Sequence, residues 1–256
     1  MDLGRVAQGT GGFVIAGRAG VSGPPTLFGY SAASAGDING DGFDDVIVGA
    51  PKAHAYADGR RSLGGEAMVV FGRAGSAGTR ITLAAIEAGS GSGGFVIHGA
   101  VSSGRAGISV ASAGDINGDG FDDLVIGADR VEGLGLSESG INKASAGATY
   151  VVYGKAAGFG GSLDLAQLTA GSSGFVIYGA DARDQAGRAV AAAGDINGDG
   201  FGDLIIGAPG GDLAGDTKFR TYAGEAYPTF TTKQSFLATN IRIPLISLIC
   251  LPERYL

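Results

Sequence analysis

The stretch GDINGDGFDD, residues Gly36–Asp45, occurs three times in this chain. It returns unchanged at 114–123 and as GDINGDGFGD at 194–203. In each copy an oxygen-bearing side chain stands at the first, third, fifth and ninth positions after the opening glycine. An apolar run follows every copy: VIVGAP, LVIGAD or LIIGAP. The pattern predicts an oxygen-rich loop that leads into a buried strand.

Other phrases recur with the same period of about 80 residues, which is the mark of a repeat architecture. GFVIAG, GFVIHG and GFVIYG begin at Gly12, Gly94 and Gly174. GEAMVVFG and GATYVVYG begin at Gly65 and Gly147, and GEAYPTF at 224–230 is an incomplete third copy. Small and β-branched residues precede every loop. Each repeat therefore contains four short strand candidates bounded by turn residues.

Four strands per repeat predict an all-β fold built from β-propeller blades, about three of them. A solenoid or a β-sandwich is the alternative, but small residues before the loops favour strands crowded near a central axis. In the first repeat, strands are expected at Ser31–Ala35, Asp45–Gly49, Glu66–Phe71 and Gly94–His98. Only two segments could form a turn or two of helix. They are Ile81–Ala88 and Leu163–Ala170.

The repeats divide the chain into a propeller segment, 1–227, and an atypical tail, 228–256. Within the segment, units are expected near 28–98, 107–179 and 187–227, and an additional fourth-strand phrase lies at 12–16. That N-terminal strand could complete the last blade. Propellers close with about four to eight blades, so three units predict an incomplete propeller. Further blades of a longer chain, or an oligomer, would complete it.

The third unit is expected to break down at Pro228, which has no N–H for a β-ladder. No repeat phrase follows, and the single cysteine, Cys250, lies in this tail. One cysteine excludes an intrachain disulfide framework. The N-terminus lacks the apolar core of a signal peptide. The run IRIPLISLICL at 241–251 is too short to span a bilayer, which needs about 20 apolar residues, so no membrane span is expected.

The composition is that of a folded, acidic protein. Among 256 residues there are 50 glycines, and hydrophobic residues make up 45%. The net charge of −7 and the pI near 4.8 argue against nucleic acid and against anionic membrane surfaces as partners. Much of the negative charge lies in the three loops. Three divalent cations would supply 3 × 2 = 6 positive charges, so the acidity indicates a metal requirement.

Each loop presents the hard oxygen donors that Ca²⁺ prefers, and Ca²⁺ accepts six to eight of them in irregular geometry. The carbonyl at the seventh position would add to the side-chain oxygens, and a glycine at the sixth allows a sharp turn. Three Ca²⁺ sites are therefore predicted. Their ligands are Asp37, Asn39, Asp41, Phe43 and Asp45; Asp115, Asn117, Asp119, Phe121 and Asp123; and Asp195, Asn197, Asp199, Phe201 and Asp203. Ile38, Ile116 and Ile196, with the three phenylalanines, are expected to anchor the loops on the sheets.

Two other interpretations of the loops remain. An EF-hand or dockerin-type loop begins in the same way but needs an acid at position twelve and flanking helices. Position twelve is Val48, Ile126 or Ile206, inside the apolar runs. An Asx-rich turn without metal is the second alternative, because Asn and Asp favour turns.

The motif D-x-N-x-D-G-x-x-D with an apolar strand and GAP resembles the FG-GAP repeat of integrin α-chain propellers and their bacterial relatives. FG-like strand ends at Phe71–Gly72 and Tyr153–Gly154 add to the resemblance, which covers about 12–227. It implies a calcium-stabilised propeller at the cell surface or outside the cell, with a role in cell adhesion or protein recognition. This chain departs from the pattern in its long repeats and in Asp129, which replaces the proline of the second GAP.

The resemblance also implies that a protein or glycan ligand binds the face opposite the calcium loops. The loops after the second strand, 50–64, 128–146 and 208–223, would lie there. Solvated loops without a partner are the alternative. Their candidate recognition residues are His54, Tyr56, Arg60, Arg61, Lys143, Lys218, Arg220 and Tyr222.

No catalytic constellation is expected. The two histidines, His54 and His98, occupy non-equivalent positions, and His98 ends a strand phrase, which favours a structural role. No nucleophile elbow or phosphate loop is present. A glycosidase would need one pair of acids rather than three copies of one loop. A non-catalytic binding module is predicted, with a calcium-dependent lectin-like module or a structural cell-surface repeat protein as alternatives.

Overall fold

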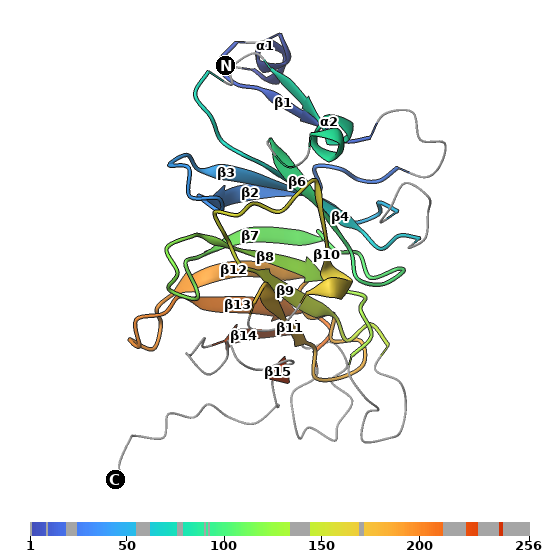
Figure 1. Cartoon of the computed structure of the whole chain (residues 1–256). Coiled ribbons are helices and arrows are strands. Elements are labelled where there is room, and N and C mark those ends of the chain that lie inside the picture. The colour runs from blue at the N-terminus through green and yellow to red at the C-terminus, as the bar shows by residue number, and fades with distance from the viewer. Residues whose placement is uncertain are drawn as a thin grey trace.

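A computed structural model describes residues 2–8, 10–18, 25–54, 62–75, 79–89, 91, 93–133, 144–168, 172–211, 224–229 and 241–242. Three antiparallel units are stacked in chain order, from the N-terminal end to the C-terminal end (Figure 1). The all-β prediction is confirmed, and the sheets form an open stack of propeller blades rather than a closed ring. The blade is the repeating unit of this chain.

Strands one to four of each unit follow in order. Unit 1 contains β2 (Ser31–Gly36), β3 (Asp45–Ala50), β4 (Glu66–Val70) and β6 (Gly94–His98). Unit 2 contains β7 (Ser109–Gly114), β8 (Asp123–Ala128), β9 (Ala148–Val152) and β11 (Gly174–Tyr178). Unit 3 contains β12 (Ala189–Gly194), β13 (Asp203–Ala208) and β14 (Glu225–Thr229). The expected strands of unit 1 are confirmed to within one residue.

A short parallel strand that the repeat phrases do not predict extends two of the sheets. β10 (Ser162–Asp164) pairs with β6, and β15 (Ile241–Arg242) pairs with β11. Both sheets therefore have five strands. β10 belongs to unit 2 but pairs with unit 1, so successive units are joined by backbone hydrogen bonds. β15 shows that part of the expected tail, 228–256, also lies in a sheet.

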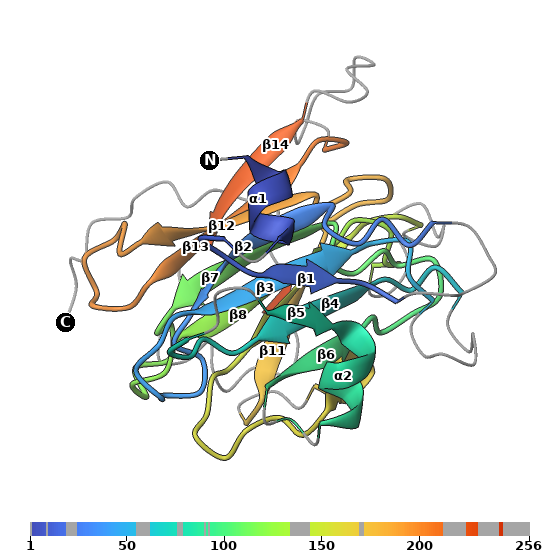
Figure 2. The ribbon, with the colours of Figure 1, turned by 90° about the horizontal axis from the view of Figure 1, so that it is seen from above.

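The sequence allowed the N-terminal strand β1 (Val14–Ala16) to complete the last blade. In the structure it does not. It pairs in parallel with β5 (Arg80–Thr82), Val14 opposite Arg80. This repeats the pairing of β6 with β10, so β1 stands where the fourth strand of a preceding blade would stand. Seen down the stack, β1, β5 and α2 (Leu83–Ala88) lie in front of the sheets (Figure 2). Helix α1 (Leu3–Ala7) precedes them, and η1 (Leu165–Gln167) follows β10.

Strand β14 continues through Pro228 and extends two residues beyond the boundary expected after residue 227. Pro228 lies opposite Ile205 of β13. Its counterpart in unit 1 is Val69, two residues before Phe71, whose N–H donates to Gly93 on the fourth-strand side. Because N–H groups alternate in direction along a strand, the missing donor of Pro228 faces away from β13. The pairing with β13 therefore loses no hydrogen bond.

The core lies between the units, and each central sheet buries both faces. Between units 1 and 2, Ile47 and Phe95 pack with Leu124, Ile126 and Tyr150. The cluster between units 2 and 3 contains Val125, Phe175, Ile177, Leu204 and Ile206. On the N-terminal side of unit 1, Met68, Val70 and Val96 are covered by residues of β1, β5 and α2.

Glycine backbones allow the first two strands of adjacent units to approach closely. A Cβ added at Gly49 would collide with the carbonyl oxygen of Gly107, and one at Gly127 with that of Gly187. The Ser31 hydroxyl donates to the Gly107 carbonyl at 2.9 Å across the same junction. This crowding accounts for the small residues before each loop.

We therefore expect Gly127→Ala to destabilise the protein by about 1–3 kcal/mol, the usual cost of overpacking a tight core. Gly202→Ala is the matched control, because its added Cβ would meet no atom closer than 3.5 Å. Denaturant unfolding of both variants measures the difference. Equal stabilities would contradict the close approach between units 2 and 3.

Candidate functional site

The three repeated loops lie side by side at one end of the strands, at the left of Figure 1. They join β2 to β3, β7 to β8 and β12 to β13. The loop glycines at the fourth and sixth positions have left-handed backbones, with φ of 74° at Gly40 and 89° at Gly42. The corresponding glycines of the other loops have φ within a few degrees of these values. The same sequence therefore gives the same local turn three times.

Within each loop the acidic side chains accept hydrogen bonds from the backbone. The Asp37 carboxylate accepts from the N–H groups of Gly40, Asp41 and Gly42 at 2.8–3.0 Å. Asn39 accepts from the Asp41 N–H at 2.9 Å and donates to the Asp41 carboxylate at 3.1 Å. The second and third loops contain the same bonds. The loops thus have the hydrogen bonding of Asx-rich turns.

The ninth-position aspartate connects the loop to the sheet. Asp45 is 1% exposed; one carboxylate oxygen accepts from the Ile38 N–H at 3.2 Å and the other from the Gly72 N–H at 2.8 Å. Asp123 accepts from Ile116 and Gly154 in the same way, at 3.0 and 2.8 Å. Asp203 accepts from the Ile196 N–H at 2.8 Å. This residue therefore closes the loop and, in units 1 and 2, fixes the end of the third strand.

Burial raises the pKa of the Asp45 and Asp123 carboxyl groups. The pKa of Asp45 is raised from 3.8 to about 6, mainly by removal from water and to a smaller extent by the charges of Asp41 and Asp37, while two backbone hydrogen bonds lower it. The pKa of Asp123 rises to about 7 for the same reasons. The loop carboxylates are thus close enough to repel one another, and a cation would relieve that repulsion.

Adjacent loops also contact each other. The Asp37 N–H donates to the Asp122 carboxylate at 2.8 Å, and the Phe121 ring lies over Gly40. Lys155 N–H donates to the Ile38 carbonyl at 3.0 Å. The eighth position of the second loop, occupied by Asp122, therefore joins unit 2 to unit 1, a role that the repeat pattern alone does not indicate.

The predicted loop anchors are only partly correct. Ile38 and Ile116 are fully buried, whereas Ile196 is 53% exposed and Phe43 is 46% exposed. Ile38 and Ile116 each have a following unit beside them. Ile196 lies in the last unit and Phe43 in the first, so the contacts that bury their counterparts are missing among the described residues.

The donor set of each loop consists of oxygens alone, which suits a hard cation. In the described part of the chain, however, no three His, Cys, Asp or Glu side chains are grouped to hold a metal ion. The carboxylates accept hydrogen bonds from backbone N–H groups instead: one oxygen of Asp37 accepts two such bonds and the other accepts one. Position twelve is buried inside β3, β8 and β13, which excludes an EF-hand.

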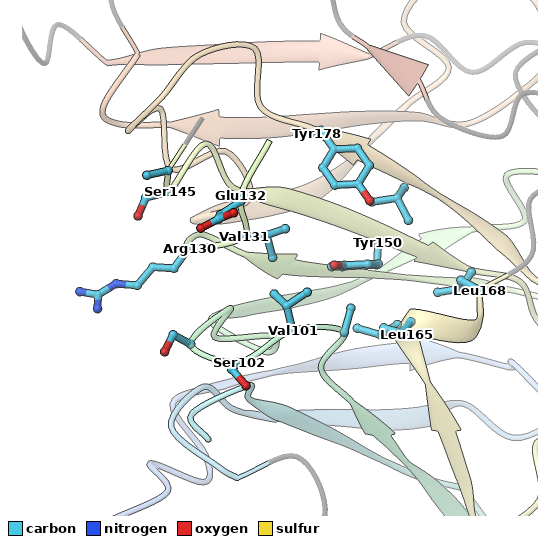
Figure 3. Close-up of a pocket in the computed structure, with 15 residues that line it drawn as sticks. Val101, Ser102, Arg130, Val131, Glu132, Ser145, Tyr150, Leu165, Leu168 and Tyr178 are labelled. Atoms are coloured by element: carbon cyan, nitrogen blue, oxygen red, sulfur yellow. The ribbon is translucent and has the colours of Figure 1, made fainter. Parts of the chain in front are cut away.

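At the opposite ends of the strands, a cavity of about 630 Å³ opens between units 1 and 2. Tyr150 and Tyr178, from neighbouring strands, form one wall, and Leu165 and Leu168 face them (Figure 3). Burial raises the pKa of the Tyr178 hydroxyl. Polar side chains complete the lining, namely Ser102, Ser103, Arg130, Glu132 and Ser145. The cavity thus combines an apolar floor with groups of both charges.

Part of the predicted recognition surface lies outside the described residues. Of its candidate side chains, only His54 is described; Tyr56, Arg60, Arg61, Lys143, Lys218, Arg220 and Tyr222 are not. The cavity residues Tyr150, Tyr178 and Leu165 were missed, because a side chain that lines a gap between two units has the same apolar pattern as one in the core.

His98 is buried at the end of β6 and takes part in a charged cluster. Its Nδ1 lies 3.2 Å from the carboxylate of Glu66, which is 2% exposed. Arg18 contacts the same carboxylate at 3.5 Å and Glu87 at 2.6 Å. This cluster joins the N-terminal segment to unit 1 and supports the structural role expected for His98.

Comparison with known proteins identifies the family to which these repeats belong. A profile described as FG-GAP repeat matches residues 28–63, 106–152 and 186–227. Integrin alpha-PS5 of Drosophila melanogaster is 32% identical over 205 residues, which is 78% of this chain and 16% of the integrin. Integrin alpha-3 of Mus musculus is 37% identical over 105 residues, 41% of this chain and 8% of the integrin.

A protein that is not an integrin matches the chain with similar identity and coverage. Phosphatidylinositol-glycan-specific phospholipase D of Bos taurus is 33% identical over 208 residues, 80% of this chain and 22% of that protein. The chain thus spans less than a quarter of the length of each of these relatives. Among the described residues, no helix has the length and apolar character needed to cross a membrane.

In the absence of metal, we expect the free energy of unfolding to fall as the pH rises from about 5 to about 8. The folded-state pKa values of Asp45 and Asp123 lie above the value of 3.8, so the folded state binds protons at these groups more tightly than the unfolded state does. Their contribution is present at low pH and is lost as the pH passes through about 6 and 7. Denaturant unfolding in chelator at a series of pH values measures the slope.

The double variant Asp45→Asn/Asp123→Asn is the control, because it removes both titrating groups and keeps an oxygen acceptor at each position. Its slope between pH 5 and 8 should be flatter than that of the unmodified chain. Stability that increases over this range, or equal slopes for the two proteins, would contradict the prediction.

Proposed function

The chain is an FG-GAP repeat protein of the integrin α type, and we propose that it is a calcium-binding, non-catalytic module for adhesion or protein recognition outside the cell. The observation that carries the proposal is the threefold repetition of one oxygen-rich loop on one side of the blades. Each copy has the same ligand types and the same internal hydrogen bonds. The proposed module comprises 1–227, with 228–256 as an atypical tail.

Each loop would hold one Ca²⁺ ion. In the first, the donors would be the side chains of Asp37, Asn39, Asp41 and Asp45 with the carbonyl oxygen of Phe43. The equivalent residues would serve in the second and third loops. Calcium supplies positive charge among carboxylates that repel one another. Because Asp45 and Asp123 also hold the ends of the third strands, bound calcium would stabilise the sheets as well as the loops.

An external location would suit sites of this kind. Calcium sites of extracellular modules have dissociation constants of about 10⁻⁴–10⁻³ M, matched to the calcium concentration there. Because the net charge of the chain is −7, binding three such ions would make the protein nearly neutral. The resemblance to integrin α chains also implies a place at the cell surface.

Ligand recognition would take place at the face opposite the calcium loops. The cavity between units 1 and 2 lies there, since Arg130 and Glu132 follow the end of β8 that is remote from its loop. Tyrosine walls with a few charged groups at the rim are typical of sites that bind a protein side chain. A glycan is the alternative ligand, because tyrosine rings also stack on sugars.

Calcium should bind with a stoichiometry of three and raise the melting temperature. At free calcium 100 times the dissociation constant, each independent site contributes about 2.7 kcal/mol. Asp119→Ala should reduce the stoichiometry to two. Isothermal titration calorimetry on chelator-treated protein measures the stoichiometry, and thermal unfolding in calcium and in chelator measures the melting temperature.

Asp44→Ala is the matched control and should keep all three sites. Asp44 occupies the eighth loop position, which is Gly202 in the third loop, and its side chain is not among the proposed donors. A melting temperature that does not change between calcium and chelator would refute the calcium proposal. Loss of a site in Asp44→Ala would refute the ligand assignment.

Tyr178→Ala should lower the affinity for the protein ligand at least tenfold without changing calcium stoichiometry. Removal of a central aromatic contact costs about 2 kcal/mol or more at such sites. The measurement is binding to arrayed extracellular proteins and to arrayed glycans in calcium. Tyr30→Ala is the control outside the cavity. Binding to glycans alone would favour the lectin-like alternative, and binding to neither array would favour the structural role.

A further inference from the structure

The cavity of about 630 Å³ between units 1 and 2 has a counterpart on the N-terminal side of unit 1. The pairing of β9 with β11 sets Ala148 opposite Tyr178, and the pairing of β4 with β6 sets Glu66 opposite His98. One face of each strand pair packs against the preceding layer of the stack. That layer is unit 1 for unit 2, and it is formed by β1, β5 and α2 for unit 1. The two places are therefore equivalent in the repeat and can be compared position by position.

At the counterpart, the chain fills the space with its own charged side chains. Arg18 directly follows the phrase GFVIAG, and its guanidinium contacts the carboxylate of Glu66 at 3.5 Å and that of Glu87 at 2.6 Å. The Nδ1 atom of His98 lies 3.2 Å from the Glu66 carboxylate. On the same strand as His98, Val96 is fully buried. A long side chain from the preceding layer thus occupies this place.

Between units 1 and 2 the same positions carry small side chains. Ala100 follows the phrase GFVIHG as Arg18 follows GFVIAG. Ala148 stands in β9 where Glu66 stands in β4. Ala100 lines the cavity. The cavity therefore lies where the preceding junction holds a long side chain and its carboxylate partner.

This replacement leaves apolar surface accessible inside the stack. Val176 is only partly buried, although Val96 at the same position of unit 1 is fully buried. Val101, which also lines the cavity, is 40% exposed. The charged residues of the described lining, Arg130 and Glu132, are both exposed, and the Arg130 side chain points away from the cavity (Figure 3). An occupant would therefore cover apolar side chains and leave both charges at the rim.

The side chains on the two sides of the cavity are suited to a flat or branched apolar group. Tyr150 and Tyr178 lie on one side, and Val101 and Leu165 lie on the other (Figure 3). Aromatic rings pair in offset or edge-to-face arrangements, and such contacts add to the free energy gained by burying apolar area. A ring or a branched aliphatic group placed between the two sides would contact both of them.

Contacts between the two loops at the mouth fix the shape of the cavity. The Arg130 N–H donates to the Gly104 carbonyl at 3.3 Å. The preceding residue, Asp129, is buried, and its carboxylate contacts Arg105 at 3.4 Å and Arg188 of unit 3 at 2.7 Å. Asp129 is the residue that replaces the proline of the second GAP, so this departure from the repeat fastens the loops of the cavity. A preformed site loses little conformational freedom when it binds.

We propose that the protein ligand of this module inserts one large uncharged apolar side chain, aromatic or branched aliphatic, between the two tyrosines and Leu165, and that charged side chains are excluded there. This rests on the proposed function and names the chemistry of the ligand. A volume of about 630 Å³ lies within the range of about 300–1,000 Å³ that binding pockets have. A guanidinium would lose its hydration without the carboxylate that Glu66 offers Arg18 at the counterpart.

A fluorescent probe tests this chemistry directly, because the chain contains no tryptophan. N-acetyl-tryptophanamide is titrated with the full chain in calcium, and its emission should shift to shorter wavelengths as the indole enters the cavity. N-acetyl-leucinamide should displace the probe. N-acetyl-argininamide should require a concentration higher by about tenfold or more, because burial of an unpaired charge is costly.

Two variants fill the cavity in different ways. Ala100→Leu introduces an apolar side chain at the position from which Arg18 fills the counterpart, and it should weaken probe binding by about tenfold or more. The double variant Ala100→Arg/Ala148→Glu rebuilds the contact between Arg18 and Glu66 and should abolish probe binding. Thermal unfolding in calcium shows that each variant is folded.

Ala157→Leu is the matched control, because Ala157 is exposed in the turn that follows Lys155 at the calcium-loop end of unit 2. It should leave probe binding unchanged. A probe that does not bind the unmodified chain, equal binding to folded Ala100→Leu, or displacement by N-acetyl-argininamide as readily as by N-acetyl-leucinamide would overturn the inference. Those results leave the proposed function in place as long as Tyr178→Ala weakens binding to the protein array. Absence of any ligand on that array, with the probe titration as expected, would instead overturn the proposed recognition function.

Discussion

The close approach of two glycine backbones at each junction between units determines how the rest of this structure is arranged. At Gly49–Gly107 and Gly127–Gly187 the chain leaves no space for a side chain, so the first two strands of adjacent sheets pack at backbone distance. The outer strands diverge from there, and the gap is filled by progressively larger residues, up to Phe95 and Phe175. The same divergence leaves room for the cavity beside Tyr150 and Tyr178.

The junction also fixes the loops relative to one another. Because the first strands are held in register, the Asp37 N–H of one loop meets the Asp122 carboxylate of the next. Within a unit, Asp45 connects its loop to the end of the third strand through two hydrogen bonds. Burial makes that carboxylate costly to ionise, and this cost is what a bound cation would offset. Packing, loop geometry and charge are thus coupled through one aspartate in each of the first two units.

Much of this arrangement could be predicted from the sequence, since the period of about 80 residues and the alternation within each phrase identify the four strands of a unit. The fifth strand could not. Ser162–Asp164 has three residues, too few for an alternating pattern, and it pairs with a strand of another unit. The exposure of Ile196 was also unpredictable, because its own sequence context equals that of the buried Ile116. Burial there depends on whether another unit follows.

The first unit differs from the other two in a way that repetition of the loop conceals. Phe28 stands where units 2 and 3 have Ala106 and Ala186, and its ring packs against Gly17 and the cluster around Met68 and Val96. That cluster, with β1 and α2, covers the outer half of the first sheet. Among the described residues, the inner half is exposed at Ala32 and Ser34, next to the turn at Leu27–Gly29. The outer half of the N-terminal surface is therefore covered by residues of the same chain, while the turn beside its inner half has the backbone geometry of an inter-unit junction.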